Sequence, residues 1–269
     1  MSKKAILIVH FGTTHLDTMK LTIDNINEKF KNEFKDYDFY EAYTSRIIIK
    51  RLREKNIYKY TPLEILSKIA SEGYEELLVQ STHIIAGIEY DNLVDEIYEY
   101  KDRFKKVNIG KPLLYHPEDY KKVVKALSEN LITKDEYANI FACHGTNSPI
   151  GASYAMLEYM FDEAGYHNVY TVSTMSFPNI EDVIPKIKKR NIKYITLMPF
   201  MFVAGEHAKK DMAIKFKEKF EANGINADKI LIKGLGEYDM INEIFVAHSK
   251  DAINNEEFDI KEFKKSFII

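Results

Sequence analysis

Three residues of types that can bind transition metals lie at or just beyond the ends of predicted strands. They are Glu89, His144 and His207. Ligands in open α/β sheets bind at the carboxyl ends of parallel strands. Two imidazoles and one carboxylate suit a borderline divalent metal such as cobalt, nickel, iron or zinc better than magnesium or calcium. Three protein ligands leave coordination positions open, so the sequence predicts a site where a metal is handled or transferred.

Each of these residues also has an ordinary structural explanation. A histidine that ends a strand, as His144 does, can be a loop residue bonded to the backbone, and His207 can be a solvated residue in a helical turn. Glu89 can be a surface carboxylate. His10 and His83 are weaker candidates at the same edge of the predicted sheets.

An internal repeat links two of the candidates. Residues 77–91 read LLVQSTHIIAGIEYD and residues 195–211 read ITLMPFMFVAGEHAKKD, each an apolar run followed by Ala-Gly. The differences 207 − 89 and 205 − 87 are both 118, so Glu89 and His207 hold equivalent places. Such a repeat predicts two similar lobes that face a shared cleft. The competing interpretation is coincidence, since any α/β protein has several apolar strands.

A second sequence similarity links the first predicted strands of the two lobes. His10-Phe11-Gly12-Thr13 resembles His144-Gly145-Thr146, and we interpret His10 and His144 as corresponding residues. From His10 to Ala86 is 76 residues, whereas His144 to Ala204 is 60, so the first lobe carries about sixteen additional residues. Cys143 directly precedes His144 and should point to the opposite side of its strand, into the core.

The remaining pattern supplies the elements that position these residues. Apolar runs of strand length alternate with segments of helical periodicity in both halves, which predicts parallel sheets. The expected strands are residues 4–10, 38–43, 75–82, 105–109, 137–143, 168–174, 194–202 and 229–233. We predict an α/β fold with two similar lobes, 1–133 and 134–269, each a parallel sheet of about four strands flanked by helices.

One predicted helix, residues 46–53, reads RIIIKRLR and is strongly basic. Arg46, Lys50 and Arg53 are spaced i, i+4 and i+7 and share one face. The segment falls in the interval that lengthens the first lobe. It is either a solvated helix face or a surface that holds a polycarboxylate ligand through charge-assisted hydrogen bonds.

Composition narrows the functional class. Of the 269 residues, 45% are hydrophobic and 29% are charged, as in ordinary globular proteins. The net charge of −3 gives no general attraction to nucleic acid or anionic membranes, and the single cysteine excludes an internal disulfide. No signal peptide or membrane-spanning run is evident, so a cytoplasmic location is expected. The oligomeric state is open, and a homo-oligomer is compatible with the sequence.

Several segments together resemble the anaerobic sirohydrochlorin cobaltochelatase family of the class II chelatases. They are VHFGTTHLDT, AYTSRIIIKRLR, TPLEILSKIASEGYEELLVQSTHIIAGIEY, CHGT and LMPFMFVAGEHAKKDMA, in the family's order and over nearly the full length. The resemblance implies a ferrochelatase-like fold with the active site in the cleft between the lobes. It also implies insertion of Co(II) into sirohydrochlorin, or precorrin-2, for cobalamin synthesis, without ATP and without a prosthetic group.

The resemblance implies roles for individual residues. His144, Glu89 and His207 match the family's metal-site positions, and His144 would also be the base that takes a pyrrole proton. With the eight carboxylates of sirohydrochlorin in mind, we expect Arg46, Lys50 and Arg53, together with His10 and His83, to contact the substrate. Insertion of iron or nickel, and a metal or tetrapyrrole binding protein without turnover, stay open as alternatives.

Overall fold

Two four-stranded parallel sheets form the framework of the protein. The computed structural model describes residues 2–205 and 214–254. The first sheet has the strand order β2-β1-β3-β4 and the second the order β6-β5-β7-β8. The strands are β1 (Lys4–His10), β2 (Asp38–Tyr43), β3 (Glu76–Ser81), β4 (Lys106–Ile109), β5 (Tyr137–Cys143), β6 (Val169–Ser173), β7 (Tyr194–Pro199) and β8 (Asn226–Ile230). The two lobes therefore repeat one topology, as the sequence predicts.

Helices connect successive strands, as parallel pairing of the strands requires. They are α1 (Leu16–Met19), α2 (Asn25–Glu33), α3 (Arg46–Arg53), α4 (Pro62–Ser71), α5 (Ile88–Tyr100), α6 (Pro117–Leu127), α7 (Ala152–Glu163), α8 (Ile180–Lys189), α9 (Lys217–Ala222) and α10 (Asp239–Asn254). A π-helical segment, Lys20–Asp24, joins α1 to α2. None of the described helices is long and apolar enough to cross a membrane.

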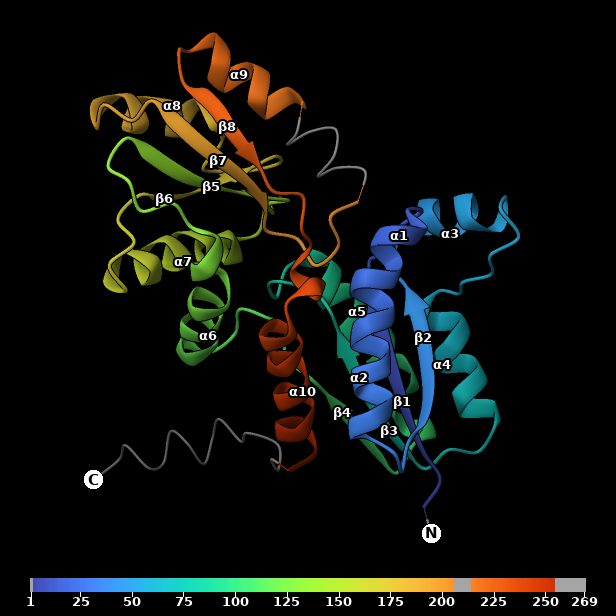
Figure 1. Ribbon diagram of the computed structural model, residues 1–269. Coiled ribbons are helices and arrows are strands. Elements are labelled where there is room, and N and C mark those ends of the chain that lie inside the picture. The colour runs from blue at the N-terminus through green and yellow to red at the C-terminus, as the bar shows by residue number, and fades with distance from the viewer. Residues whose placement is uncertain (1, 206–213, 255–269) are drawn as a thin grey trace, which may run out of the picture.

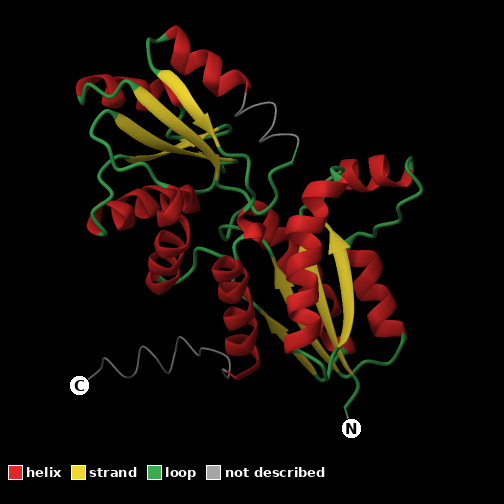
Figure 2. Ribbon diagram, viewed as in Figure 1, coloured by secondary structure: helices red, strands yellow, loops and turns green. Residues whose placement is uncertain are grey.

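The carboxyl ends of both sheets point toward the region between the lobes (Figure 2). Because each strand is followed by a loop and a helix, the loops that follow the strands lie together at one edge of each sheet. The loops after β1, β3, β5 and β7 carry the candidate residues. The repeat thus brings chemically active loops from both lobes to one place.

Hydrophobic packing encloses each sheet on two faces. In the first lobe, Leu7 and the residues two positions away from it in β1 face α4 and α5. Ile6 and Ile8 face α2 and α10 on the other side of the sheet. In the second lobe, α8 and α9 cover one face of the sheet and α7 lies on the other. Burial on both faces explains why these strands are nearly continuous apolar runs.

The last helix of each half leaves its own sheet. Helix α6 follows β4 but packs against α7 of the second lobe, and α10 follows β8 but packs against β3, β4 and α2 of the first (Figure 1). The two helices also contact each other. One hydrophobic cluster consequently runs from the first sheet through α6 and α10 into the second.

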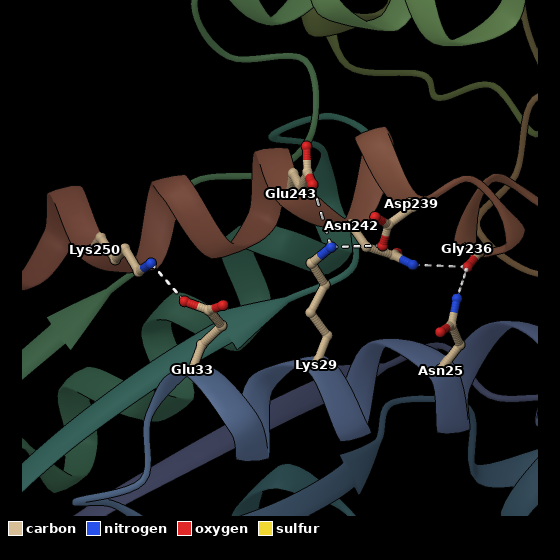
Figure 3. A network of polar contacts seen from close by, with 8 residues as sticks. All are labelled: Asn25, Lys29, Glu33, Gly236, Asp239, Asn242, Glu243 and Lys250. Carbon is tan, nitrogen blue, oxygen red and sulfur yellow. Dashed lines mark hydrogen bonds and ion pairs between the residues drawn. The ribbon is translucent and has the colours of Figure 1, made fainter.

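Polar contacts fix α10 along α2 (Figure 3). Lys29 pairs with Asp239 and Glu243, and Lys250 pairs with Glu33 at 2.6 Å. The amide of Asn25 donates to the carbonyl of Gly236 at the start of the same region. Apart from Lys29, the charged side chains of these pairs are largely exposed, so each pair contributes little to stability by itself.

The additional residues of the first lobe form α3. Strand β5 begins 137 − 4 = 133 residues after β1, whereas β7 begins 194 − 76 = 118 residues after β3, so the first lobe is longer by 133 − 118 = 15 residues. Helices α3 and α4 both lie between β2 and β3, while α8 alone lies between β6 and β7, a stretch that is described throughout. This agrees with the predicted excess of about sixteen residues.

Candidate active site

The loops after the inner strands of the two lobes touch each other reciprocally. A Cβ atom added to Gly87, in the loop after β3, would lie 3.6 Å from Oγ1 of Thr146, in the loop after β5. A Cβ atom on Gly205, in the loop after β7, would lie 3.2 Å from Oγ1 of Thr13, in the loop after β1. Each Ala-Gly phrase of the repeat therefore meets the opposite lobe, with a tight approach at Gly205 and an ordinary van der Waals distance at Gly87.

Glu89 lies in the first turn of α5, beyond Gly87, with its side chain half exposed. Nε2 of His83 lies 3.6 Å from Oε2 of Glu89, slightly too far for a hydrogen bond. The contact with His83 lowers the pKa of Glu89 most strongly, burial opposes this change, and the nearby His144 lowers the pKa further. Two imidazoles, one from each lobe, thus favour the carboxylate form of Glu89.

The two ring nitrogens of His83 make no hydrogen bond to the described part of the protein. The side chain is only 12% exposed. Buried imidazole nitrogens normally find partners. An imidazole placed this way beside Glu89 is suited to bind or orient a group that enters the site.

His144 directly follows β5, on a loop whose backbone is fixed by hydroxyl groups. Its carbonyl accepts a hydrogen bond from Thr174 Oγ1 at 2.9 Å. The next residue, Gly145, has φ +87°, and a Cβ atom there would lie 1.9 Å from Ser173 Oγ. Only glycine fits this position, and the exposed His144 side chain is carried on a backbone that is held tightly.

The third predicted metal ligand, His207, lies outside the described residues. Ala204, which leads toward it, is buried, and Gly205 contacts Thr13 as described above. Among the residues that the structure does describe, no three His, Cys, Asp or Glu side chains are close enough to hold a metal ion. The structure places His83 of the same lobe beside Glu89, and His144 of the other lobe is near enough to affect the charge of Glu89, but these three side chains do not form a metal site by themselves.

His10 occupies a different environment from the one predicted. It is fully buried at the end of β1, where Nδ1 lies 3.1 Å from Thr82 Oγ1 and Nε2 lies 3.0 Å from Asn27 Oδ1. Burial lowers its pKa to about 4, so the ring is neutral. Both nitrogens are bonded to protein, and we leave His10 out of the residues proposed to touch a substrate.

The correspondence between His10 and His144 is corrected by the strand registers. The offset of 133 between β1 and β5 equates His10 with Cys143 and Phe11 with His144. Cys143 is fully buried, as predicted, and burial raises the pKa of its thiol. Matching the two histidines therefore displaces one strand by one residue relative to the other. Such a displacement exchanges the two faces of a strand, so that a side chain in the core is matched with one that points away from it.

The basic residues of α3 share one surface, as predicted. Arg46, Lys50 and Arg53 line a depression of about 250 Å³ together with Ile49, Thr61 and Glu64. The hydrogen bond from the Thr61 backbone lowers the pKa of Glu64, and Arg53 and Arg46 contribute smaller effects. The depression thus combines three cations with one acid at the start of α4.

A second depression, of about 410 Å³, lies in the second lobe beside the loop of His144, and sequence reasoning missed it. The residues that line it come from four segments and show no shared spacing that could have revealed them. They are Thr146, Ser148, Gly151, Ala152, Ala155, Glu158, Ser176, Phe177, Pro178 and Lys186.

Comparisons with known proteins agree with this architecture. A sirohydrochlorin cobaltochelatase of Salmonella typhimurium is 34% identical over 258 residues, covering 94% of this chain and 97% of that protein. The sirohydrochlorin cobaltochelatase CbiKC of Nitratidesulfovibrio vulgaris is 29% identical and covers 94% and 92%. Both relatives thus extend over nearly the whole chain.

Solved structures confirm the predicted fold. SirB from Bacillus subtilis with Fe³⁺ superposes with a TM-score of 0.69 at 14% identity, covering 94% of this chain and 96% of that one. The SirB of Bacillus subtilis subspecies spizizenii in complex with cobalt gives 0.66 at 14%, covering 95% and 97%. The two-lobed chelatase architecture is therefore shared.

A family model decides membership. The model described as cobalt chelatase (CbiK) matches residues 4–254, which includes both lobes and the facing loops. This chain belongs to the cobalt chelatase (CbiK) family.

Proposed function

We propose that this protein inserts Co(II) into sirohydrochlorin, at the facing loops of its two lobes. The observation that carries the proposal is the contact between the loops that bear Glu89 and His144, Gly87 beside Thr146, at the carboxyl ends of the two sheets. The substrate named for both relatives and the matching family model support the choice of metal and tetrapyrrole. Precorrin-2 is a second tetrapyrrole that the same site could accept.

The proposed metal site combines Glu89, His144 and His207. A carboxylate and two imidazoles bind Co(II) well and leave positions open for the pyrrole nitrogens. Glu89 is ready for this role because His83 holds its pKa below the usual range. Cobalt is a substrate here and leaves with the product, so exposed ligands on loops suit the reaction better than a closed structural site.

His144 is the proposed base. Each nitrogen–metal bond that replaces a pyrrole N–H releases a proton, and a neutral imidazole beside the metal can accept one. Binding a macrocycle that is bent out of plane would expose its nitrogen lone pairs to the metal, and preference for the bent form over the flat one lowers the barrier. The tightly held backbone of His144 keeps the imidazole in place for this step.

The substrate contacts are proposed for Arg46, Lys50 and Arg53 on α3 and for His83 beside Glu89. Sirohydrochlorin is an octacarboxylate, and cations are its natural partners. No ATP and no prosthetic group are needed in this scheme, and the reaction is assigned to the cytoplasm. Residues 1–133 and 134–269 are proposed as the two lobes between which the substrates bind, with α6 and α10 each packed against the other lobe.

The test follows the visible absorption of sirohydrochlorin with Co(II), Fe(II) and Ni(II) in separate reactions without ATP. We expect many turnovers per protein molecule and the fastest conversion with cobalt. Faster conversion with iron or nickel would reassign the metal. A single stoichiometric spectral change, with no turnover, would instead identify a metal or tetrapyrrole carrier.

A further inference from the structure

The depression beside the loop of His144 has the composition of a site for an acidic side arm. We propose that it binds one carboxylate-bearing peripheral arm of the tetrapyrrole, an inference that rests on the proposed function. The depression of about 410 Å³ has apolar walls from Phe177, Pro178 and Ala155 and one cation, Lys186. Such walls suit the methylene groups of an arm, and the ammonium suits its carboxylate.

Hydroxyl groups at one side of the depression are already oriented. The backbone N–H of Thr146 donates to Ser176 Oγ at 3.1 Å, and the N–H of Ser148 donates to Thr146 Oγ1 at 3.2 Å. Because Thr146 Oγ1 acts as acceptor in that bond, its hydroxyl hydrogen can be donated to an anion. The Ser176 hydroxyl is paired with Ser173 Oγ at 2.9 Å, which holds this wall rigid.

Glu158 lines the depression, but its carboxylate is hydrogen-bonded to a residue of β6. Oε1 of Glu158 accepts hydrogen bonds from both the backbone N–H and the hydroxyl of Thr171, each at 2.6 Å. These bonds direct the Glu158 carboxylate toward β6 and satisfy part of its charge. An entering carboxylate would therefore lie beside Lys186 and the hydroxyls, away from Glu158.

The location connects the depression to the proposed metal site. Thr146 forms part of its wall, lies two residues after His144, and is the residue that approaches Gly87 of the other lobe. Gly87 in turn lies two residues before Glu89. A macrocycle centred over Glu89 and His144 would extend its rim in this direction.

The rim of the depression also offers apolar surface. Phe177 is 69% exposed and Met175 is 62% exposed, both on the loop after β6. Large exposed apolar side chains next to an oriented polar pocket are typical of ligand contacts. This loop is tied to the loop of His144 by the hydroxyls of Ser173 and Thr174. One arm and one edge of the macrocycle would thus be held by the segment that also positions the proposed base.

The experiment measures binding without metal, by fluorescence titration, for sirohydrochlorin and for its methyl ester. Lys186→Ala should raise the Kd for the free acid about threefold to tenfold, because one partly exposed charge-assisted contact is lost. It should leave the Kd for the ester unchanged. Lys189→Ala, on the same helix but outside the depression, is the matched control and should bind both ligands as the wild type does.

A second variant tests the cavity itself. Ala155 is exposed on α7, so Ala155→Leu should fold normally while filling the depression, and it should weaken binding of both ligands. The subsite is refuted if Lys186→Ala binds the free acid as tightly as the wild type, or loses the same factor on the ester. If the wild type binds sirohydrochlorin without inserting cobalt, the proposed function fails and these comparisons still decide the subsite; if it does not bind, both fail.

Discussion

His10 is enclosed by protein at the end of β1, and its environment makes a prediction about pH. Its pKa is lowered from the ordinary 6.5 to about 4 by burial. The unfolded chain therefore binds a proton at this position below about pH 6.5, whereas the folded chain does so only near pH 4. Stability contributed by this residue is present above pH 6.5 and is lost as the pH falls through that window.

Between pH 7.5 and pH 5, His10 should lower the free energy of unfolding by about 2 kcal/mol. Urea unfolding of the wild type and of His10→Gln at both pH values measures the effect. The variant should be less stable overall, because the bonds to Asn27 and Thr82 change, but its stability should depend less on pH by that amount. Identical pH dependence in the two proteins would show that His10 is not a buried neutral histidine.

Glu89 should act through its charge. Glu89→Gln keeps the size of the side chain but removes the carboxylate, so Co(II) binding should weaken about tenfold or more while sirohydrochlorin binding persists. A competition titration with a metal-sensitive dye measures the first quantity and tetrapyrrole fluorescence the second. Glu99→Gln, exposed further along α5, is the control. Wild-type cobalt affinity in Glu89→Gln would remove this residue from the metal site.

At the residue scale, the sequence predicted which loops lie close together better than it predicted which residues of the two lobes correspond. The common offset of 118 placed the two Ala-Gly phrases correctly, and both contact the opposite lobe. The match of His10 to His144 was wrong by one residue. Aligning the histidines of HFGT and HGT gives an offset of 134, whereas aligning their Gly-Thr letters gives 133, and the pairing of the strands agrees with the second register.

Among the elements, α3 is the one that distinguishes the first lobe. Arg46→Ala and Arg53→Ala should each raise the KM for sirohydrochlorin about threefold to tenfold with little change in kcat, because each removes one exposed charge-assisted contact. High salt should shrink the effect. Arg51→Ala, on the same helix but outside the depression, is the control. Unchanged KM at low ionic strength in both variants would return this surface to an ordinary solvated helix face.

Local signals predicted most element boundaries. Thr61 caps α4, Pro62 is its first residue and Glu64 completes a capping box, a pattern that can be read from the sequence. Strand β8 was expected at 229–233 but spans Asn226–Ile230. Its first residues are polar because it is an edge strand and largely exposed, so hydrophobic periodicity pointed to the apolar residues after it. The π-helical segment between α1 and α2 left no sign in the apolar pattern.

At the scale of the whole molecule, the exchange of α6 and α10 between the lobes could not be predicted. The order of elements does not say which sheet a terminal helix covers. The exchange depends partly on a buried pair: Nε2 of His248 lies 3.0 Å from Oδ1 of Asp119, and both side chains are under 5% exposed. The sequence pattern gives no sign that His248 joins α10 to α6.

Breaking this pair should be costly. His248→Ala leaves Oδ1 of Asp119 buried without its partner, although Oδ2 still accepts a hydrogen bond from the backbone N–H of His116, and it should lower the free energy of unfolding by about 3 kcal/mol. His167→Ala removes a histidine from an exposed pair with Asp162 and should cost under about 1 kcal/mol. Chemical denaturation of both variants provides the comparison. Equal losses would show that the pair does not lock the two lobes together.

The central claim concerns a site assembled from both lobes, in which His144 is ligand and base while His207 is ligand alone. A cobalt titration of His144→Ala and His207→Ala at saturating sirohydrochlorin tests it most directly. General base catalysis is worth about 100- to 10,000-fold. Excess cobalt should therefore restore much of the rate of His207→Ala and little of that of His144→Ala. Equal restoration of both variants would contradict the account and leave His144 as a ligand only.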